Sequence, residues 1–213
     1  MATRLEGDFD YIVVGAGSAG CVLANRLSAD SRSRVLLLEA GGRDNWIWYH
    51  IPVGYLFAIG NPRSDWRFQT EPEPGLNGRR INYPRGKVIG GSSSINAMIS
   101  MRGQLRDYDD WRQLGLTGWS GDEVFATFKR LDNHFLGESE HHGAHGEWRV
   151  EQQRLRWDVL ETVREAAVQM GIPAIPDFNR GDNEGVSYFQ VNQKKGRRWS
   201  AARAFLKPVL KRP

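Results

Sequence analysis

Three glycines with the spacing Gly-x-Gly-x-x-Gly are the residues of this sequence that point most directly to chemistry. They are Gly15, Gly17 and Gly20, and they directly follow the apolar run 11–14. In a strand–turn–helix the first glycine permits a tight turn, the second lets the backbone approach a pyrophosphate, and the third lets the helix pack against the strand. Because a helix N-terminus attracts anions, residues 15–20, with Ser18 and Ala19, are predicted to bind a nucleotide phosphate.

The elements that must position this turn can be recognised on either side of it. Residues 11–14 are β-branched and aromatic, which is typical of a strand buried on both faces of a parallel sheet. A helix is predicted over about 18–29, and its apolar face comprises Cys21, Val22, Ala24 and Leu27. A second buried strand, 35–38, ends in Glu39, at the distance from Gly20 where a βαβ unit brings a carboxylate to the ribose hydroxyls of a dinucleotide. The sequence therefore predicts an α/β fold of the Rossmann type, with a carboxylate that repels the 2′-phosphate of NADP.

Length and composition narrow the class of protein. The 213 residues suit one to one and a half domains, and 40% hydrophobic with 25% charged residues is typical of a soluble globular chain. The net charge of +4 is only mildly basic and does not predict a nucleic-acid partner. Cys21 is the single cysteine, so we expect no intrachain disulfide and a small buried hydrophobe. No apolar run has the length of a membrane span and no hydrophobic signal region begins the sequence, so we expect the cytoplasm, with peripheral attachment to the inner membrane as an alternative.

A second glycine-rich stretch follows further along the chain. It reads Gly86-Lys87-Val88-Ile89-Gly90-Gly91-Ser92-Ser93-Ser94-Ile95-Asn96. Paired glycines followed by three serines predict an anion-binding turn, with the serines capping a helix that begins near Ile95. The order of glycine, lysine and serine excludes a phosphate loop of the Walker type. Taken alone, the stretch also fits a close crossing of two backbone segments.

Together these motifs resemble the glucose–methanol–choline (GMC) oxidoreductases, flavoproteins that oxidise alcohols. The second stretch is similar to the first signature of that family, and residues 10–20 with 38–41 are similar to its FAD fingerprint. The resemblance spans essentially the whole chain and is strongest to the bacterial choline-dehydrogenase-like and alcohol-dehydrogenase branch. It implies a Rossmann-like FAD-binding domain over residues 1–144, the first segment of an α+β substrate-binding domain over 145–196, and a return toward the FAD domain over 197–213.

The resemblance also implies which residues bind the cofactor. They are Gly15, Gly17, Ser18, Ala19, Gly20, Glu39, Ala40, Gly41, Arg85, Gly86, Lys87, Val88, Gly90, Gly91, Ser92, Asn96, Ala97, Met98 and Ile99. Asn96 and Ala97 are expected near the reactive edge of the flavin. Some members tether FAD through a histidine at the position of Ile95, so we expect non-covalent FAD here. Ser100 stands where members commonly have an aromatic residue or alanine, which leaves the shape of the pocket near the flavin open.

The activity implied is oxidation of a primary alcohol to an aldehyde, with hydride passing to flavin N5. Met98, Ile99 and Met101 favour a modestly apolar alcohol, and either oxygen or a quinone fits as electron acceptor. Family members are more than twice this long, and their catalytic histidine lies beyond the position of Pro213. We therefore assign no catalytic residue, and expect the missing C-terminal part of the same protein as a partner. The five histidines of this chain are His50, His134, His141, His142 and His145.

The rest of the chain looks structural. Residues 43–82 form an aromatic-rich excursion that we expect to be plugged onto the body of the protein. Helices are predicted over 107–114, after the Ser120–Glu123 capping box, over 158–170 and over 201–206, and a strand over 186–191. The buried stripe of the second helix comprises Val124, Phe125, Phe128 and Leu131.

Four alternatives stay open at this point. The loop 140–147, with three histidines, could hold a transition metal, although a solvated, flexible turn is favoured and no metal ligand is assigned. The basic cluster 194–198 could bind nucleic acid or a membrane, although a hairpin-like surface turn is favoured. The dinucleotide could be NAD, as in an NAD-dependent Rossmann dehydrogenase. Finally, the chain could be an inactive, truncated nucleotide-binding fragment, and we expect a chain ending at Pro213 to be inactive alone.

Overall fold

A computed structural model describes residues 6–212 of the chain. The chain forms two compact units: one comprises the residues up to Ala97 together with those from Arg197 onward, and the other comprises Met98–Gly196. The boundary near residue 197 coincides with the expected return of the chain, whereas residues 98–144 belong with the second unit. The functional division at residue 144 stays a prediction.

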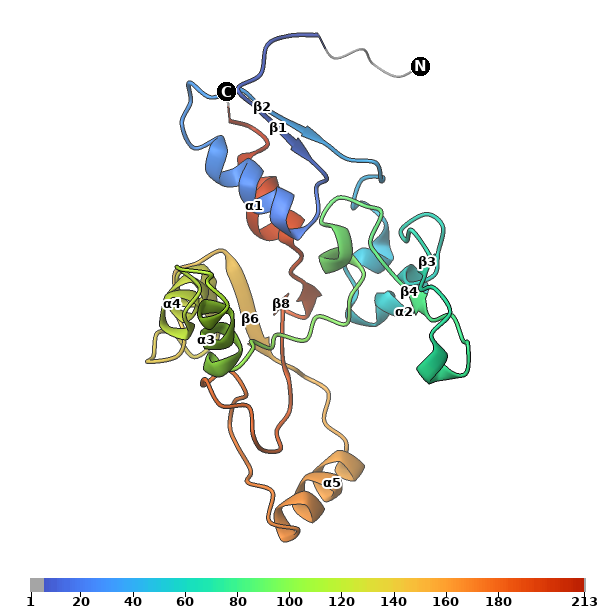
Figure 1. Cartoon of the computed structure of the whole chain (residues 1–213), viewed down its shortest axis with the longest axis vertical. Coiled ribbons are helices and arrows are strands. Elements are labelled where there is room, and N and C mark those ends of the chain that lie inside the picture. Colours follow the sequence, from blue (N-terminus) through green and yellow to red (C-terminus); the bar gives the residue numbers. More distant parts are fainter. Residues whose placement is uncertain (1–5, 213) are drawn as a thin grey trace. The chain divides into compact units, whose positions relative to one another are not determined.

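A small parallel sheet with one helix begins the first unit (Figure 1). Strand β1 (Tyr11–Val14) pairs in parallel with β2 (Val35–Leu38), and α1 (Ser18–Leu27) connects them. These elements confirm the predicted strand–turn–helix–strand, with the helix ending two residues earlier than expected. The expectation that β1 is buried on both faces is wrong within this chain, because Val13 is buried but Val14 is 83% exposed. Two strands and one helix cannot cover both faces of a parallel sheet.

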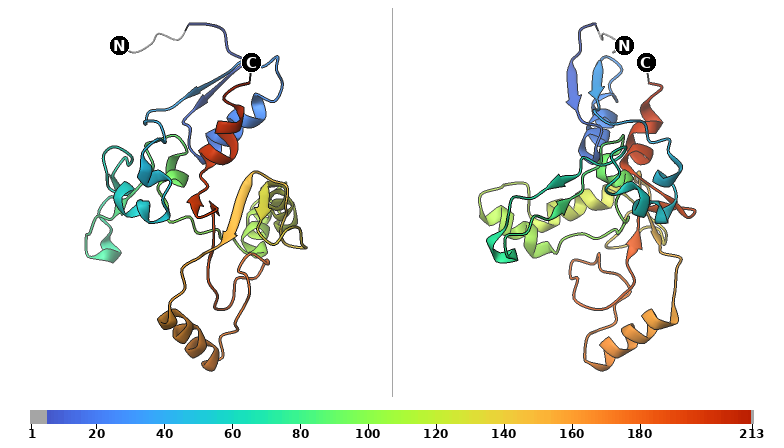
Figure 2. Two further views of the ribbon diagram at one scale, coloured as in Figure 1. Left: turned by 180° about the vertical axis from the view of Figure 1, so that it is seen from behind. Right: turned by 90° about the vertical axis from the view of Figure 1, so that its right-hand side faces the viewer.

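The C-terminal segment packs on α1, and the two views of Figure 2 agree on this. It comprises a π-helix, η5 (Ala202–Leu206), and a 3₁₀-helix, η6 (Lys207–Val209). The helix predicted over 201–206 is thus present, although it is wider than an α-helix and continues past Pro208. Asn25 of α1 donates its side-chain Nδ2 to the backbone oxygen of Phe205 at 2.7 Å, and both residues are buried.

The excursion after β2 consists of short elements. They are η1 (Ile47–Tyr49), η2 (Pro52–Gly54), α2 (Tyr55–Ala58), β3 (Phe68–Gln69), η3 (Pro74–Leu76) and β4 (Asn82–Tyr83). A core cluster of Tyr49, Ala58, Val88 and Ile95, with Trp46 packed against it, joins the excursion to the second glycine-rich stretch. This confirms the expected plugging for Trp46 and Tyr49, whereas Phe57, Trp66 and Phe68 stay about half exposed.

The second unit combines helices with a three-stranded sheet. Its elements are α3 (Leu105–Gln113), α4 (Gly121–Leu131), β5 (Asp132–His134), β6 (Trp148–Gln152), α5 (Asp158–Gln169), β7 (Gln190–Val191) and β8 (Gln193–Lys194). The sheet order is β5-β6-β7, with β5 parallel and β7 antiparallel to β6. The Ser120–Glu123 capping box is confirmed, because each side chain accepts the backbone N–H of the other residue. The strand predicted over 186–191 is confined to its last two residues.

The basic cluster near residue 196 differs in part from its prediction. A two-residue turn with positive φ at Lys195 and Gly196 leads into β9 (Arg197–Arg198), as expected for a hairpin-like turn. However, Arg198 is only 1% exposed, so the prediction of a surface turn is wrong for this residue.

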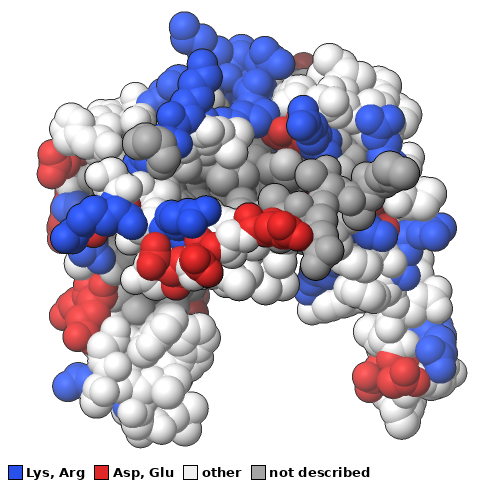
Figure 3. Space-filling view, turned by 90° about the horizontal axis from the view of Figure 1, so that it is seen from above, with Lys and Arg blue, Asp and Glu red and all other residues white. Residues whose placement is uncertain are grey.

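On the face shown in Figure 3, Lys and Arg side chains form several groups with Asp and Glu side chains among them.

Within residues 6–212, no helix is both long enough and apolar enough to cross a membrane.

We predict that Asn25→Ala destabilises the protein by about 1–3 kcal/mol, since it removes a buried hydrogen bond to a main-chain carbonyl. Urea denaturation of the variant and the wild type measures the difference. Asn45→Ala, at an exposed position, is the matched control. An Asn25 variant as stable as this control would show that the bond between α1 and η5 contributes nothing measurable.

Candidate functional site

The two glycine-rich stretches meet at one cavity in the first unit. Its volume is about 590 Å³, and it is lined by Val14, Gly15, Gly17, Leu38, Glu39, Ala40, Trp66, Gly86 and Gly91. The backbone N–H of Gly90 donates to the carbonyl of Ala16 at 2.7 Å. A Cβ atom placed on Gly91 would lie 2.8 Å from the Cα of Gly17. The first stretch therefore touches the second without any side chain between them.

The turn between β1 and α1 has the geometry that its glycines predict. Gly15 has φ +95°, and its N–H donates to the carbonyl of Leu38 at the end of β2. A Cβ on Gly20 would lie 1.9 Å from the carbonyl oxygen of Gly15, so only glycine fits there. Gly17 precedes α1, and no side chain of the described residues caps the helix. The positive end of α1 is thus left for a ligand at the cavity, where an anion is favoured.

Glu39 is fixed at the end of β2 by two main-chain donors. Its Oε2 accepts the N–H of Ala16 at 2.7 Å, and its Oε1 accepts the N–H of Gly41 at 2.6 Å. A carboxylate has about four acceptor positions, so these bonds leave room for two hydroxyl donors from a ligand. A Cβ on Gly41 would lie 2.2 Å from the carbonyl of Lys87, which explains the glycine by the close crossing of the second stretch.

The three serines of the second stretch bond its own backbone. Gly91–Ser94 form a 3₁₀-helix, η4, after Gly90 with φ +92°. Ser93 Oγ donates to the carbonyl of Gly90 at 2.6 Å, and Ser94 Oγ donates to the carbonyl of Ile89 at 2.8 Å. The prediction of a helix beginning near Ile95 is wrong, because the hydroxyls close the turn locally and do not cap a following helix.

The remaining predicted cofactor residues are distributed as follows. The first turn of α1 contains Ser18, Ala19 and Gly20. The side chain of Ser92 accepts the N–H of Gly86, and Val88 is fully buried. The exposed residues of the set are Arg85, Asn96 and Ala97. Met98 and Ile99 belong to the second unit, where Met98 is buried with φ +64°. The structure thus brings Gly15, Gly17, Glu39, Ala40, Gly86 and Gly91 to one cavity. The cofactor-binding roles of these and of the other residues stay predictions.

Trp66 lines this cavity and was missed by reasoning from the sequence. The neighbouring Asp65 holds it in place, since this buried carboxylate accepts three backbone N–H groups, from Gly60, Arg67 and Arg85. Burial opposes the charge of Asp65, but these hydrogen bonds outweigh it and lower its pKa. The ammonium group of Lys87 lies 4.5 Å from the centre of the Trp66 ring system. No local signal separates Trp66 from the other aromatic residues of the excursion, because its position depends on Asp65 and a stretch twenty residues away.

These features fit a pyrophosphate-bearing dinucleotide. The cavity wall consists of glycine backbone where Cβ atoms would intrude, a helix begins at it, and one carboxylate suits a pair of ribose hydroxyls.

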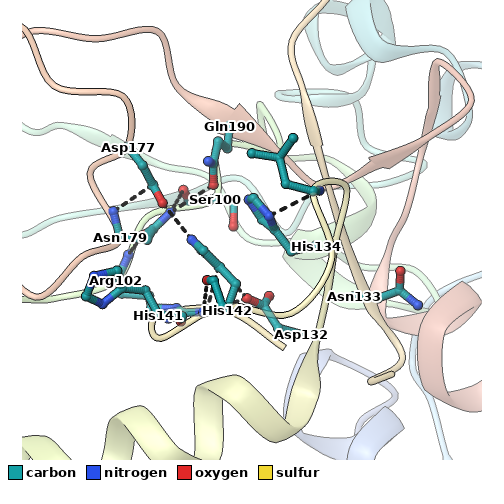
Figure 4. Close-up of polar contacts among 12 residues, drawn as sticks. Ser100, Arg102, Asp132, Asn133, His134, His141, His142, Asp177, Asn179 and Gln190 are labelled. Atoms are coloured by element: carbon teal, nitrogen blue, oxygen red, sulfur yellow. Dashed lines mark hydrogen bonds and ion pairs between the residues drawn. The ribbon is translucent and has the colours of Figure 1, made fainter. Parts of the chain in front are cut away.

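The second unit contains a buried network of charges, shown in Figure 4. The imidazole of His142 lies between two carboxylates, with Nδ1 2.7 Å from Asp132 Oδ2 and Nε2 2.6 Å from Asp177 Oδ2. Arg102 forms an ion pair with Asp132 and donates to the carbonyl of His141. With His142 protonated, two cations balance two carboxylates. His142 and Gly143 of the loop predicted to be solvated and flexible are therefore part of the interior, and that prediction is wrong for them, whereas Glu140 and His145 are exposed.

The glycines of the same loop allow close approach to α4. A Cβ on Gly143 would lie 2.0 Å from the carbonyl of Lys129, and a Cβ on Gly146 would lie 2.0 Å from that of Leu131. His134, His142 and Asp177 each offer a possible metal-ligand atom, and these atoms lie within 4.8 Å of one another. This set of candidate ligands differs from the three loop histidines considered from the sequence. However, both ring nitrogens of His142 already form hydrogen bonds with carboxylates. Its ring also stacks on that of His134, with 3.8 Å between the ring centroids. Charge balance accounts for this cluster.

The protonation of His142 follows from its surroundings. Burial opposes the charged ring, but the hydrogen bonds to Asp132 and Asp177 outweigh it and raise the pKa of His142 above 6.5. The pKa of Asp177 is lowered, since the bonds from His142 and the backbone N–H of Asn179 outweigh its burial. The stabilisation from His142 is hence complete below pH 6.5 and is lost as the pH rises through its folded-state pKa. The contribution of Asp177 is lost only in acid, below about 3.8.

We predict that His142→Gln lowers the free energy of unfolding by about 3–5 kcal/mol at pH 6, because it breaks a buried ion-pair network. The gap between wild type and variant narrows as the pH is raised from 6 toward 9, because the wild-type imidazole loses its proton as the pH rises through its raised pKa. Urea denaturation at both pH values measures the gap, with His145→Gln as the control at an exposed histidine. A gap that is equal at both pH values would contradict the charge assignment.

Comparisons with known proteins agree with the fold. The profile of the GMC oxidoreductase family matches residues 9–213. An alcohol dehydrogenase (acceptor) of Pseudomonas putida is 47% identical over 206 residues, which cover 96% of this chain and 37% of that protein. An oxygen-dependent choline dehydrogenase of Sinorhizobium fredii is 44% identical over 204 residues, with 96% and 37% covered.

Two solved structures are similar as well. Pyridoxine 4-oxidase from Mesorbium loti has a TM-score of 0.91 and 36% identity, covering 96% of this chain and 41% of that one. An FAD-dependent oxidoreductase from Chaetomium thermophilum has a TM-score of 0.87 and 28% identity, covering 97% and 37%.

The chain thus spans roughly two fifths of the length of these proteins, with the α/β fold of their FAD-binding region. Since the family profile extends over nearly the whole sequence, the chain belongs to the GMC oxidoreductases, a family of FAD-binding enzymes.

Proposed function

We propose that the protein to which this chain belongs oxidises a primary alcohol to an aldehyde, with FAD as the acceptor of the hydride. The observation that carries the proposal is the single cavity lined by both glycine-rich stretches, since one stretch alone would suit any nucleotide. Similarity to proteins named alcohol dehydrogenase and choline dehydrogenase supports an alcohol as substrate. The proposed electron acceptor is oxygen or a quinone, and the proposed location is the cytoplasm or the surface of the inner membrane.

Each part of the cavity has a proposed role in holding the cofactor. The N-terminus of α1 with Gly15 and Gly17 binds the pyrophosphate, and Glu39 accepts the ribose hydroxyls. Gly86 and Gly91 let the second stretch approach the cofactor from another side. Bound FAD supplies a two-electron acceptor for the hydride. The residues of this chain bind and orient it, and none of the described residues is proposed as the catalytic base.

Non-covalent binding is part of the proposal. Ile95 is 2% exposed and packs with Tyr49, Ala58 and Val88. An aliphatic side chain offers no nucleophile for a bond to the flavin, so the position at which some family members tether FAD holds a core residue here.

We predict that the purified full-length protein shows the absorption bands of oxidised FAD, and that acid precipitation releases all of the flavin into the supernatant. Addition of a primary alcohol with an artificial electron acceptor should give aldehyde, because the cofactor then turns over. Flavin that stays with the precipitate would contradict non-covalent binding. A nicotinamide cofactor in place of flavin would support an NAD-dependent dehydrogenase and overturn the proposal.

We predict that Gly91→Ala weakens FAD binding at least tenfold. The substitution adds a Cβ that meets Gly17 at 2.8 Å, and it forces a non-glycine residue to adopt φ +54°, which costs about 1–2 kcal/mol. Titration with FAD, followed by flavin fluorescence, measures the dissociation constant. Gly75→Ala is the matched control, since a Cβ there meets nothing within 4 Å. Equal affinities of the two variants would show that the contact between the stretches is not needed for binding.

A further inference from the structure

The side chain of Arg198 is buried in the first unit next to the second glycine-rich stretch. At 1% exposure, it is the largest fully buried side chain within residues 6–212. Its Nη1 donates to the carbonyl of Ser93 at 3.2 Å and to Oδ1 of Asn96 at 2.8 Å. The backbone N–H of Arg198 donates to the carbonyl of His50, which fixes the base of the side chain. The guanidinium therefore holds both η4 and the residue that follows it.

The rest of this guanidinium is unusual in being unpaired. Its Nε and Nη2 are buried and have no hydrogen-bond partner among the described residues. Burial lowers the pKa of Arg198 to about 10, and no carboxylate of the described residues offsets the burial. The group still carries its proton near neutral pH. A charge buried without a counterion is costly, so a structural role alone explains Arg198 poorly.

The contact with Asn96 also sets the orientation of an exposed amide. Only the oxygen of an amide can accept a bond from a guanidinium, so Arg198 fixes Oδ1 of Asn96 on its own side. The NH₂ group of Asn96 then points in the other direction within the plane of the amide. Arg198 thereby decides which end of this side chain is presented away from the interior.

The guanidinium of Arg198 contacts the 3₁₀-helix η4, which reaches the candidate cofactor cavity. Ser93 belongs to η4, whose first residue, Gly91, lines that cavity. Because η4 is protein and not water, the charge is weakly screened. A positive charge in this place favours whichever state of a bound group carries more negative charge.

We propose that Arg198 is a positioning residue whose unpaired charge, in contact with η4, stabilises the reduced form of the bound flavin. The proposal rests on the proposed function. Hydride transfer breaks the α-C–H bond of the alcohol and brings two electrons and one proton to flavin N5, while the hydroxyl proton leaves to a base or to water. Without a second proton the reduced flavin is an anion, so a nearby cation shifts the two-electron equilibrium toward it.

The test is the midpoint potential of the flavin in the full-length protein, measured by reduction against a reference dye. Arg198→Gln removes the charge but keeps an N–H donor. We expect it to lower the two-electron equilibrium constant at least tenfold, which corresponds to a potential about 30 mV lower. Arg198→Lys keeps the positive charge but loses the planar set of guanidinium N–H donors. We expect its two-electron equilibrium constant to lie within threefold of the wild-type value. Arg197→Gln, at the exposed neighbouring residue, is the control.

Each outcome decides the proposal. A Gln variant with the wild-type potential would overturn it. If the Gln variant does not retain flavin, the Lys variant decides, since a tenfold fall with the charge retained would show that only the hydrogen bonds matter. A wild-type protein without flavin would overturn both this proposal and the proposed function, whereas a wild-type protein that binds flavin, with no shift of potential in the Arg198→Gln variant, would overturn this proposal alone.

Discussion

The close approach of two backbone segments without intervening side chains is the constraint on which the first unit depends. Gly91 lies against Gly17, and Gly41 lies against the carbonyl of Lys87, at distances where any Cβ atom would collide. The hydrogen bond from Gly90 to Ala16 joins the same two segments. Since these contacts leave backbone on the cavity wall, the absence of side chains both closes the fold and opens a place for a pyrophosphate. The fold and the proposed cofactor binding therefore depend on the same glycines.

Buried charged side chains hold together the regions in which no glycine contact joins two backbone segments. In the first unit, Asp65 gathers three main-chain donors and brings Trp66 to the cavity. In the second unit, His142 joins Asp132 and Asp177 into a balanced network. Hydrogen-bonded buried charges of this kind favour one arrangement of the chain, because the loss of one partner leaves a buried charge without its hydrogen bonds. Arg198 stands apart as the buried cation for which the described residues supply no carboxylate.

Local patterns predicted the parts of the fold whose causes are local. The β1–α1–β2 unit and the Ser120–Glu123 capping box were predicted correctly, because a few neighbouring residues decide them. The features that depend on distant partners were not. The burial of His142 requires Asp177, 35 residues away, and the burial of Arg198 requires Ser93, 105 residues away. Likewise, six predicted cofactor residues line one cavity, but Trp66 could not be predicted, since its place is set by Asp65 and the second glycine-rich stretch.

Backbone hydrogen exchange, measured in the full-length protein across a titration with FAD, tests most directly whether both bends hold one cofactor. Amides 15–20 and 86–94 should gain protection together, with the same dissociation constant, because a single ligand contacts both segments. Protection of one segment while the other exchanges as in the free protein would contradict the shared site, and the proposed oxidation of an alcohol would then lose its structural basis.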